Sequence, residues 1–221
     1  MQYYGLKDSN GIPLDKKLDE IFKHKSNGTY IELGANNGIL QSNTYFFEKN
    51  RNWNGVLIEA SPILYEICKN NRPNSKCYNY ACVSNDYNKK TVLGDFNFSN
   101  PKDGLMSSIN SVRRSRYKNT LIEVNCNNLT NILIDSKIST SIDLLSLDVE
   151  GHEYQVLKGL DFNKYKINYI LVEIYNKDFN NITSYLNENN YSLKENFSNY
   201  NKLNNSRWDG THNDYLFKLD K

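Results

Sequence analysis

Hydrophobic residues follow two alternating spacings along this chain. Short apolar runs predict buried strands, and apolar positions recurring every three or four residues predict helices. Leu14, Leu18, Ile21 and Phe22 have the helical spacing, and Pro62 suits the first turn of a later helix. The elements that we expect are helices over 14–25, 42–49, 62–70, 129–135, 151–159 and around 182–186, and strands over 29–33, 56–58, 76–83, 91–98, 142–149, 169–174, 191–195 and 215–219.

Strands alternate with helices over most of the chain. This order indicates an α/β sandwich with a mainly parallel sheet. The strand expected over 142–149 is a nearly unbroken apolar run, as predicted when helices cover both faces of a parallel sheet. A length of 221 residues suits one domain, since domains commonly contain about 100–200 residues.

Four of the expected strands close on an acidic residue. These residues are Glu32, Glu59, Asp148 and Glu173. Ligands of open α/β sheets bind at the carboxyl ends of the strands. We therefore interpret the shared polarity of these strand ends as a ligand site.

The turn after Glu32 indicates the class of ligand. It contains Gly34 and Gly38 but lacks the third glycine of the dinucleotide fingerprint. The Glu32 carboxylate would repel a pyrophosphate, whereas it would attract the sulfonium and ammonium groups of S-adenosylmethionine (SAM). Glu59 is suited to accept hydrogen bonds from both ribose hydroxyls. The pattern favours SAM, and no P-loop lysine motif indicates an NTPase.

Further residues are candidates for the same site. Asn43 is expected either to touch the methionine end of SAM or to cap a helix. Ala81 and Cys82 are expected to lie along the adenine or to pack in the core, and the glycines also fit an ordinary tight turn. The predicted cofactor-binding residues are Glu32, Gly34, Asn36, Gly38, Asn43, Glu59, Ala60, Ala81 and Cys82.

Charge and cysteine content narrow the class of protein. A net charge of +2 offers no broad basic surface, so a nucleic-acid partner is not expected. The short basic cluster Arg113–Arg116 is either a solvated loop or a contact for an anionic group. The four cysteines form no CxxC pair, which disfavours structural zinc. Unpaired thiols, no signal peptide and no apolar run of about 20 residues predict a cytoplasmic protein without a membrane span.

Several sequence stretches resemble the FkbM-type family of SAM-dependent methyltransferases. The most specific is Leu147–Glu153 (LDVEGHE), followed by Val156–Gly159, and the others are Tyr30–Gly38, Ser42–Thr44, Leu57–Pro62, Val172–Ile174 and Asn213–Phe217. The resemblance implies a Rossmann-like class I methyltransferase sandwich, with a mainly parallel central sheet flanked by helices and an antiparallel C-terminal strand. It implies SAM as methyl donor and O-methylation of sugars or polyketide-type products. We expect residues 1–28 to form an N-terminal helical cap and 29–221 the methyltransferase domain.

Two mechanisms remain open for the acceptor hydroxyl. In the first, Asp148 and Glu173 bind a divalent cation such as Mg²⁺, with Glu150 or Asn176 as further ligands. In the second, Asp148, Glu150 or His152 is a general base. His152 stands where the family usually has a small residue, and it also fits a helix start without a chemical role.

These features predict a SAM-dependent O-methyltransferase that acts on a carbohydrate hydroxyl, in a glycan or an activated sugar. The alternatives are a non-sugar small-molecule hydroxyl, an NAD-dependent sugar-modifying oxidoreductase and a non-enzymatic binding module. The segment 100–117 is the expected acceptor loop, and Trp208 either packs at the core edge or stacks on a sugar. The polar residues of this segment are Lys102, Asp103, Ser107, Ser108, Arg113 and Tyr117. The sequence does not determine the oligomeric state.

Overall fold

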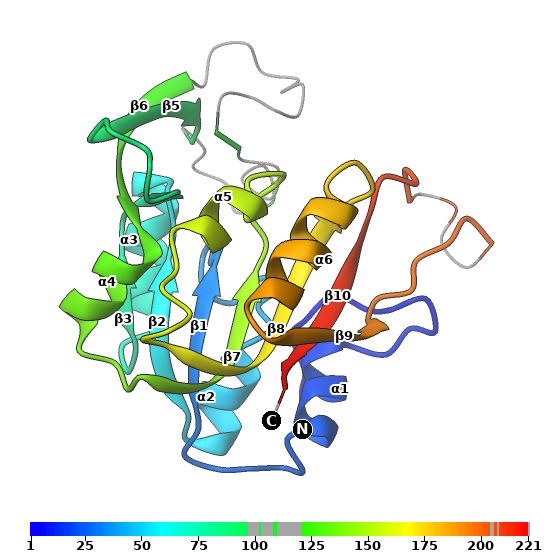
Figure 1. The fold of residues 1–221 in the computed structure, drawn as a ribbon. Helices are drawn as coiled ribbons and strands as arrows, with labels where there is room; N and C mark the ends of the chain where they lie inside the picture. Colours follow the sequence, from blue (N-terminus) through cyan, green and yellow to red (C-terminus); the bar gives the residue numbers. More distant parts are fainter. Residues whose placement is uncertain (97–101, 103–107, 110–120, 204–205, 207, 221) are drawn as a thin grey trace.

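The computed structural model describes residues 1–96, 102, 108–109, 121–203, 206 and 208–220. Helices and strands alternate through most of this part of the chain (Figure 1). The elements are α1 (Leu14–Ile21), β1 (Thr29–Leu33), α2 (Tyr45–Arg51), β2 (Asn54–Ile58), α3 (Pro62–Asn71), β3 (Lys76–Tyr78), β4 (Ala81–Val83), β5 (Thr91–Asp95), β6 (Leu121–Asn128), α4 (Leu129–Ser136), β7 (Ser141–Leu147), α5 (Glu153–Lys158), β8 (Lys166–Tyr175), α6 (Phe179–Glu188), β9 (Tyr191–Asn196) and β10 (His212–Leu219).

A seven-stranded sheet with the order β3-β2-β1-β7-β8-β10-β9 forms the centre of the molecule. Strands β3, β2, β1, β7 and β8 pair in parallel, whereas β10 is antiparallel to both β8 and β9. The predicted class I methyltransferase fold with an antiparallel C-terminal strand is confirmed. The strand order reverses between β1 and β7, and ligands bind beside such a switch point.

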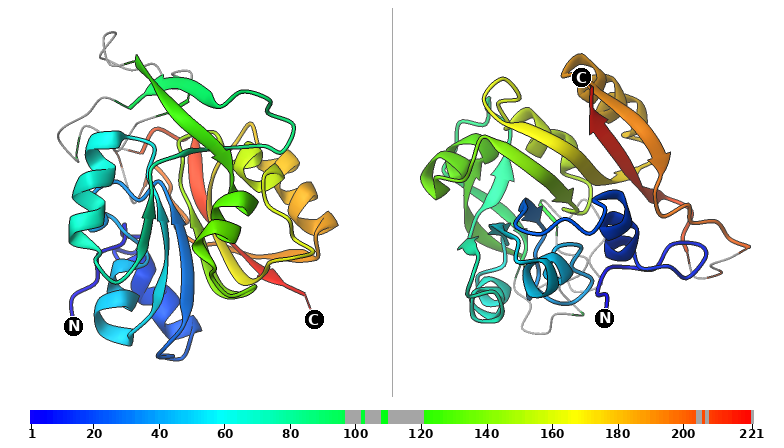
Figure 2. Two further views of the ribbon diagram at one scale, coloured as in Figure 1. Left: turned by 90° about the vertical axis from the view of Figure 1, so that its left-hand side faces the viewer. Right: turned by 90° about the horizontal axis from the view of Figure 1, so that it is seen from below.

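Two hydrophobic layers cover the faces of this sheet. Helices α1, α2 and α3 contribute to the layer on one face, and α4, α5 and α6 to the layer on the other (Figure 2). In β1, Tyr30 faces the first layer while Ile31 and Leu33 face the second, because successive side chains of a strand point to opposite faces. Burial on both faces explains the continuous apolar runs of the central strands.

The strand expected over 76–83 is wrong as a single element. Strand β3 pairs with β2 in the central sheet, whereas β4 pairs with β6 in a separate three-stranded sheet. Asn79 lies at the break, and its Nδ2 donates to the carbonyl oxygens of Glu59 (2.8 Å) and Ala60 (3.0 Å). These bonds hold the chain beside the end of β2 while it crosses to the second sheet.

Strand β6 was not predicted, and β5 ends at Asp95, before the expected end at 98. Apart from Lys102 and Ser108, the polar residues of the predicted acceptor loop lie outside the described residues.

The expected helix over 14–25 ends at Ile21. Lys23 and His24 have positive φ angles of 51° and 59°, which end the helical path. The expected helix over 42–49 begins later, at Tyr45, whose backbone N–H donates to Ser42 Oγ at 3.0 Å. Within the described part of the chain, no helix combines the length and the apolar character needed to cross a membrane.

Candidate functional site

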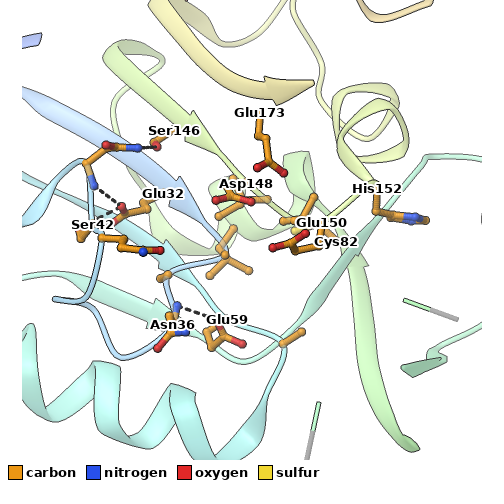
Figure 3. A pocket seen from close by; sticks show the side chains of 18 of the residues that line it. Glu32, Asn36, Ser42, Glu59, Cys82, Ser146, Asp148, Glu150, His152 and Glu173 are labelled. Atoms are coloured by element: carbon orange, nitrogen blue, oxygen red, sulfur yellow. Dashed lines mark hydrogen bonds between the residues drawn. The ribbon is translucent and has the colours of Figure 1, made fainter. Parts of the chain in front are cut away.

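A cavity of about 440 Å³ opens at the carboxyl edge of the sheet, beside the ends of β1, β2 and β7. This volume falls within the usual range of small-molecule sites, about 300–1,000 Å³. All but one of the predicted cofactor-binding and catalytic residues line it, as does Glu173, and Figure 3 shows several of them converging. The exception is Gly38, which does not belong to the lining.

The Glu32 carboxylate lies at one end of the cavity and is held by hydroxyl and backbone donors. Ser42 Oγ lies 3.0 and 2.9 Å from the two carboxylate oxygens, Thr44 Oγ1 donates at 2.6 Å, and the backbone N–H of Asn43 donates at 3.0 Å. The side chain is buried. These bonds fix the direction of the carboxylate against the cavity wall.

Gly34 begins the turn after β1, where the backbone passes close to Asp148, the residue after β7, and only glycine fits there. Its φ is +75°, and a Cβ added there would stand 1.8 Å from the carbonyl oxygen of Asp148. Glycine is the residue that accepts both the positive φ and the close approach. The cofactor turn and the acid after β7 therefore lie directly against each other.

Glu59, just after β2, holds the other side of the turn. Its carboxylate accepts from the backbone N–H of Asn36 (2.7 Å) and of Ser61 (2.8 Å). Burial raises the pKa of Glu59 to about 7, against the opposing effect of these backbone hydrogen bonds. A buried carboxylate in this position suits the paired hydroxyls of a ribose.

Asn43 does not cap helix α2, whose N-cap residue is Thr44. Asn43 Nδ2 donates instead to Ser146 Oγ at 3.1 Å. Its Oδ1 is buried and has no hydrogen-bond partner among the described residues. The ammonium group of SAM would supply the donor that this oxygen lacks.

Part of the cavity wall is apolar. It includes the predicted residues Ala60, Ala81 and Cys82, together with Phe96 and Ile109, which were not predicted. Burial raises the pKa of the Cys82 thiol, so the side chain is uncharged and apolar in character. A flat apolar ring such as adenine fits this wall, and the residues that line the cavity therefore fit all three parts of SAM.

Three carboxylates gather in the middle of the cavity. One ligand atom each from Asp148, Glu150 and Glu173 lies within 4.8 Å of the others, and Figure 3 shows their carboxylates turned toward a common space. Tyr175 OH donates to Glu150 Oε2 at 2.7 Å. Three oxygen donors of this kind fit a hard cation such as Mg²⁺.

Glu173 is the most perturbed member of this group. Burial, followed by the charges of Asp148 and Glu150, raises its pKa well above the usual value of a glutamate. His212 Nε2 lies 3.3 Å from its Oε1, and Oε2 has no hydrogen-bond partner within the described part of the chain. Glu173 is therefore suited either to hold a proton or to share a cation.

His152 occupies the N-cap position of α5. Its ring points away from the three carboxylates in Figure 3, and burial lowers its pKa to about 4. Asn176 also lies apart from the group, since its Nδ2 donates to the Gly210 carbonyl at 2.8 Å. The structure thus brings Asp148, Glu150 and Glu173 together and gives His152 and Asn176 other surroundings.

The connection between β9 and β10, together with the first residue of β10, supplies further cavity residues. Tyr200, Asp209 and His212, which were not predicted, line the cavity, and so does Trp208, for which stacking on a sugar was one of two alternatives. The Trp208 indole N–H donates to the His212 carbonyl at 2.8 Å. Leu6, from the predicted cap segment, also contributes to the wall. No hydrophobic periodicity marks these positions, so only the fold identifies them.

Solved structures share this fold at low sequence identity. A TehB-like SAM-dependent methyltransferase from Corynebacterium glutamicum matches with a TM-score of 0.50 and 8% identity, over 94% of this chain and 87% of that chain. The METTL16 methyltransferase domain matches with a TM-score of 0.53 and 7% identity, over 94% of this chain and 66% of that chain. A search of the curated proteins found no match.

The family comparison is more specific. The model of the methyltransferase FkbM domain matches residues 32–193, a range that includes the cofactor turn, the three clustered carboxylates and most of the central sheet. This range is more than half of the chain and contains most of the stretches that resembled the family in the sequence, among them Leu147–Glu153; Asn213–Phe217 lies outside it. The chain belongs to the FkbM methyltransferase family and is a SAM-dependent methyltransferase.

Proposed function

We propose that this methyltransferase transfers the methyl group of SAM to a hydroxyl of a carbohydrate. The observation that carries the proposal is the group formed by Asp148, Glu150 and Glu173, which faces the same cavity as the cofactor turn. A sugar hydroxyl is a weak nucleophile whose proton must be removed. The alternative of an NAD-dependent oxidoreductase is set aside because the family consists of methyltransferases.

The cavity residues suggest how SAM is held. Glu59 binds the ribose hydroxyls, the wall around Ala81 and Cys82 holds the adenine, and Asn43 with Glu32 holds the methionine end. When bound, SAM supplies an electrophilic methyl group and leaves as a neutral thioether. The chain's own contribution is to align donor and acceptor, which accounts for a large share of rate enhancement in such reactions.

A carboxylate of the group then accepts the proton that the acceptor hydroxyl loses. Asp148 and Glu173 are the best placed, because Asp148 directly follows β7, Glu173 lies near the end of the neighbouring strand β8, and one carboxylate oxygen of each lies within 4.8 Å of the other. The raised pKa of Glu173 makes it a stronger base than an exposed glutamate. His152 is a weaker candidate, because burial lowers its pKa.

A divalent cation is the other use of the same carboxylates. Asp148, Glu150 and Glu173 would hold it, and it would supply Lewis-acid polarisation of an oxygen. The buried Oε2 of Glu173, without a hydrogen-bond partner among the described residues, supports this assignment. We therefore propose Mg²⁺ as a second component of the site.

The β9–β10 connection supports a carbohydrate acceptor. Tyr200 and Trp208 offer aromatic surface to the cavity, and Asp209 and His212, the first residue of β10, offer polar groups to it. Aromatic side chains with nearby hydrogen-bonding groups suit the apolar faces and hydroxyl edges of a sugar. A non-sugar hydroxyl would make less use of the polar groups.

Methyl transfer from isotopically labelled SAM to a panel of acceptors tests the proposal. Neutral glycosides and activated sugars are compared with phenols and polyketide-type alcohols, and linkage analysis locates the methyl group. Labelled O-methyl sugar is the expected product. Methylation of only the non-sugar acceptors would contradict the carbohydrate assignment.

The same assay in excess EDTA tests whether turnover requires a divalent cation. Loss of turnover, restored by Mg²⁺, is expected if the carboxylates hold a metal. Full activity after exhaustive chelation would leave the carboxylates as the base and remove Mg²⁺ from the proposal.

A further inference from the structure

Arg72, which follows helix α3, has a fully buried side chain with 0% exposure. Its guanidinium donates to five different acceptors. Nε bonds Glu48 Oε2 (2.7 Å), Nη1 bonds the Gly38 carbonyl (2.8 Å) and Ser42 Oγ (3.3 Å), and Nη2 bonds Tyr30 OH (2.6 Å) and Thr44 Oγ1 (3.0 Å). A guanidinium has five N–H donors, so this geometry uses all of them.

Two of these acceptors connect Arg72 with the cavity. The hydroxyl oxygens of Ser42 and Thr44 accept hydrogen bonds from Arg72, and the same hydroxyl groups donate hydrogen bonds to the Glu32 carboxylate. Arg72 Nη1 also lies 3.6 Å from Glu32 Oε2. The guanidinium therefore determines which way both hydroxyls point, and both hydroxyls hold the carboxylate that lines the cavity.

Arg72 also explains Gly38, the predicted cofactor residue that does not line the cavity. The Gly38 carbonyl accepts from Arg72, and a Cβ added at Gly38 would stand 2.7 Å from Arg72 Cγ. Gly38 has a φ of +79°. The glycine makes room for the arginine, and the arginine fixes the end of the cofactor turn from behind.

The charges around Arg72 leave a negative carboxylate at the cavity. Glu48 Oε2 accepts from Arg72 Nε, from Tyr30 OH at 2.5 Å and from Ser75 Oγ at 2.6 Å. Glu48 thus balances the arginine on the side away from the cavity. Glu32 is left as the second carboxylate beside one cation, with its charge available to a cationic ligand group.

We infer that Arg72 is a positioning residue for the methionine end of SAM. It does not touch the cofactor. It acts through Ser42 and Thr44 on Glu32, and through the Gly38 carbonyl on the turn. This inference rests on the placement of SAM under the proposed function, with the ribose at Glu59 and the amino-acid end at Glu32 and Asn43.

Two ligands separate this role from general structural damage. S-adenosylhomocysteine contains the amino-acid end, whereas 5′-methylthioadenosine lacks it and keeps the adenosine. In Arg72→Lys, which has three donors instead of five, calorimetry should show an affinity for S-adenosylhomocysteine lower by about tenfold to hundredfold, the effect of losing charge-assisted hydrogen bonds. The affinity for methylthioadenosine should stay close to that of the wild type.

Thr44→Val provides a second test that leaves Arg72 in place. It removes the hydroxyl that accepts from Arg72 and donates to Glu32, and it should weaken S-adenosylhomocysteine alone. If Arg72→Lys does not fold, this variant decides the question. Arg51→Lys is the matched control, because Arg51 makes a bidentate pair with the buried Asp19 at 2.8 and 2.7 Å and does not line the cavity.

The control should lose thermal stability and retain the affinity for both ligands. Two outcomes would overturn the positioning role of Arg72. In the first, folded Arg72→Lys and Thr44→Val bind S-adenosylhomocysteine as tightly as the wild type does. In the second, they lose affinity for both ligands equally. Failure of the wild-type protein to bind S-adenosylhomocysteine would instead overturn the proposed placement of the cofactor, so the two failures are distinguishable.

Discussion

The acids at the carboxyl edge of the sheet have different surroundings, which separate their roles. Glu32 is surrounded by hydroxyl donors and Arg72, whereas Glu59 accepts from the backbone of the turn. Asp148 and Glu173 lie in the acidic group at the centre of the cavity. The first two therefore suit a fixed ligand, and the last two suit a proton or a cation.

At the scale of the residue, Asp148→Asn separates catalysis from cofactor binding. The amide keeps the shape of the side chain but removes the charge needed by either a base or a cation. We expect turnover to fall by roughly 100-fold or more, the usual effect of losing a general base. The affinity for S-adenosylhomocysteine should change little.

Asp143→Asn is the control for this variant. Asp143 lies near the other end of β7, where it pairs with Lys25 (2.6 Å) and the Thr29 backbone N–H (2.9 Å). It should lose stability and keep its turnover at temperatures where it is folded. A wild-type rate in Asp148→Asn would exclude Asp148 from the reaction.

At the scale of the element, the close crossing between the turn after β1 and the segment after β7 determines the shape of the site. Gly34→Ala would place a methyl group 1.8 Å from the Asp148 carbonyl oxygen at a φ of +75°. Positive φ and overpacking together should lower the free energy of unfolding by about 2–6 kcal/mol. Cofactor affinity should also fall, because the turn must move.

Gly11→Ala measures the cost of the φ angle alone. Gly11 has a φ of +80°, and no atom lies within 4 Å of an added Cβ. Its substitution should cost about 1–2 kcal/mol and leave ligand affinity unchanged. Equal denaturation curves for the two variants would show that the Gly34 crossing is not tight in solution.

Elements with strong local signals could be predicted from the sequence, and those defined by tertiary pairing could not. Strands β1 and β7 are apolar because helices cover both faces, and Pro62 begins α3 as expected. Strand β6 is an exception: Ile122, Val124 and Cys126 alternate with polar residues and pack in the small core of the second sheet, a local signal that the prediction missed. The division between β3 and β4 depends on the side-chain bonds of Asn79, which periodicity does not reveal.

The same distinction applies to the site. The strand-end acids could be predicted because a parallel sheet brings the carboxyl ends of its strands to one edge. Arg72 gave no signal, since its acceptors come from β1, α2 and the turns between them. Trp208 was an open alternative and lines the cavity, because the β9–β10 connection returns to the carboxyl edge.

At the scale of the whole molecule, buried acids link stability to pH. Burial raises the pKa of Glu59 and Glu153 to about 7, and the pKa of Asp15 and Asp214 to about 6. The unfolded chain releases these protons near pH 4 to 4.5, the ordinary range of carboxyl groups. Between that range and pH 7 the folded protein therefore binds more protons than the unfolded chain.

The free energy of unfolding of the ligand-free protein should accordingly decrease as pH rises toward 7, by about 1.4 kcal/mol per pH unit for each proton held only by the folded state. His152 opposes this trend, because its lowered pKa of about 4 makes the unfolded chain bind the extra proton below about pH 6.5. The four acids with raised pKa values have a larger combined effect than this one histidine. Above about pH 6.5 His152 is neutral in both states and no longer opposes the decrease.

Denaturant-induced unfolding measured between about pH 5.5 and 8 gives the slope of the free energy of unfolding against pH. Glu59→Gln removes one titrating carboxyl group and should make the decrease shallower, and an unchanged slope in this variant would show that Glu59 is already ionised in the folded protein.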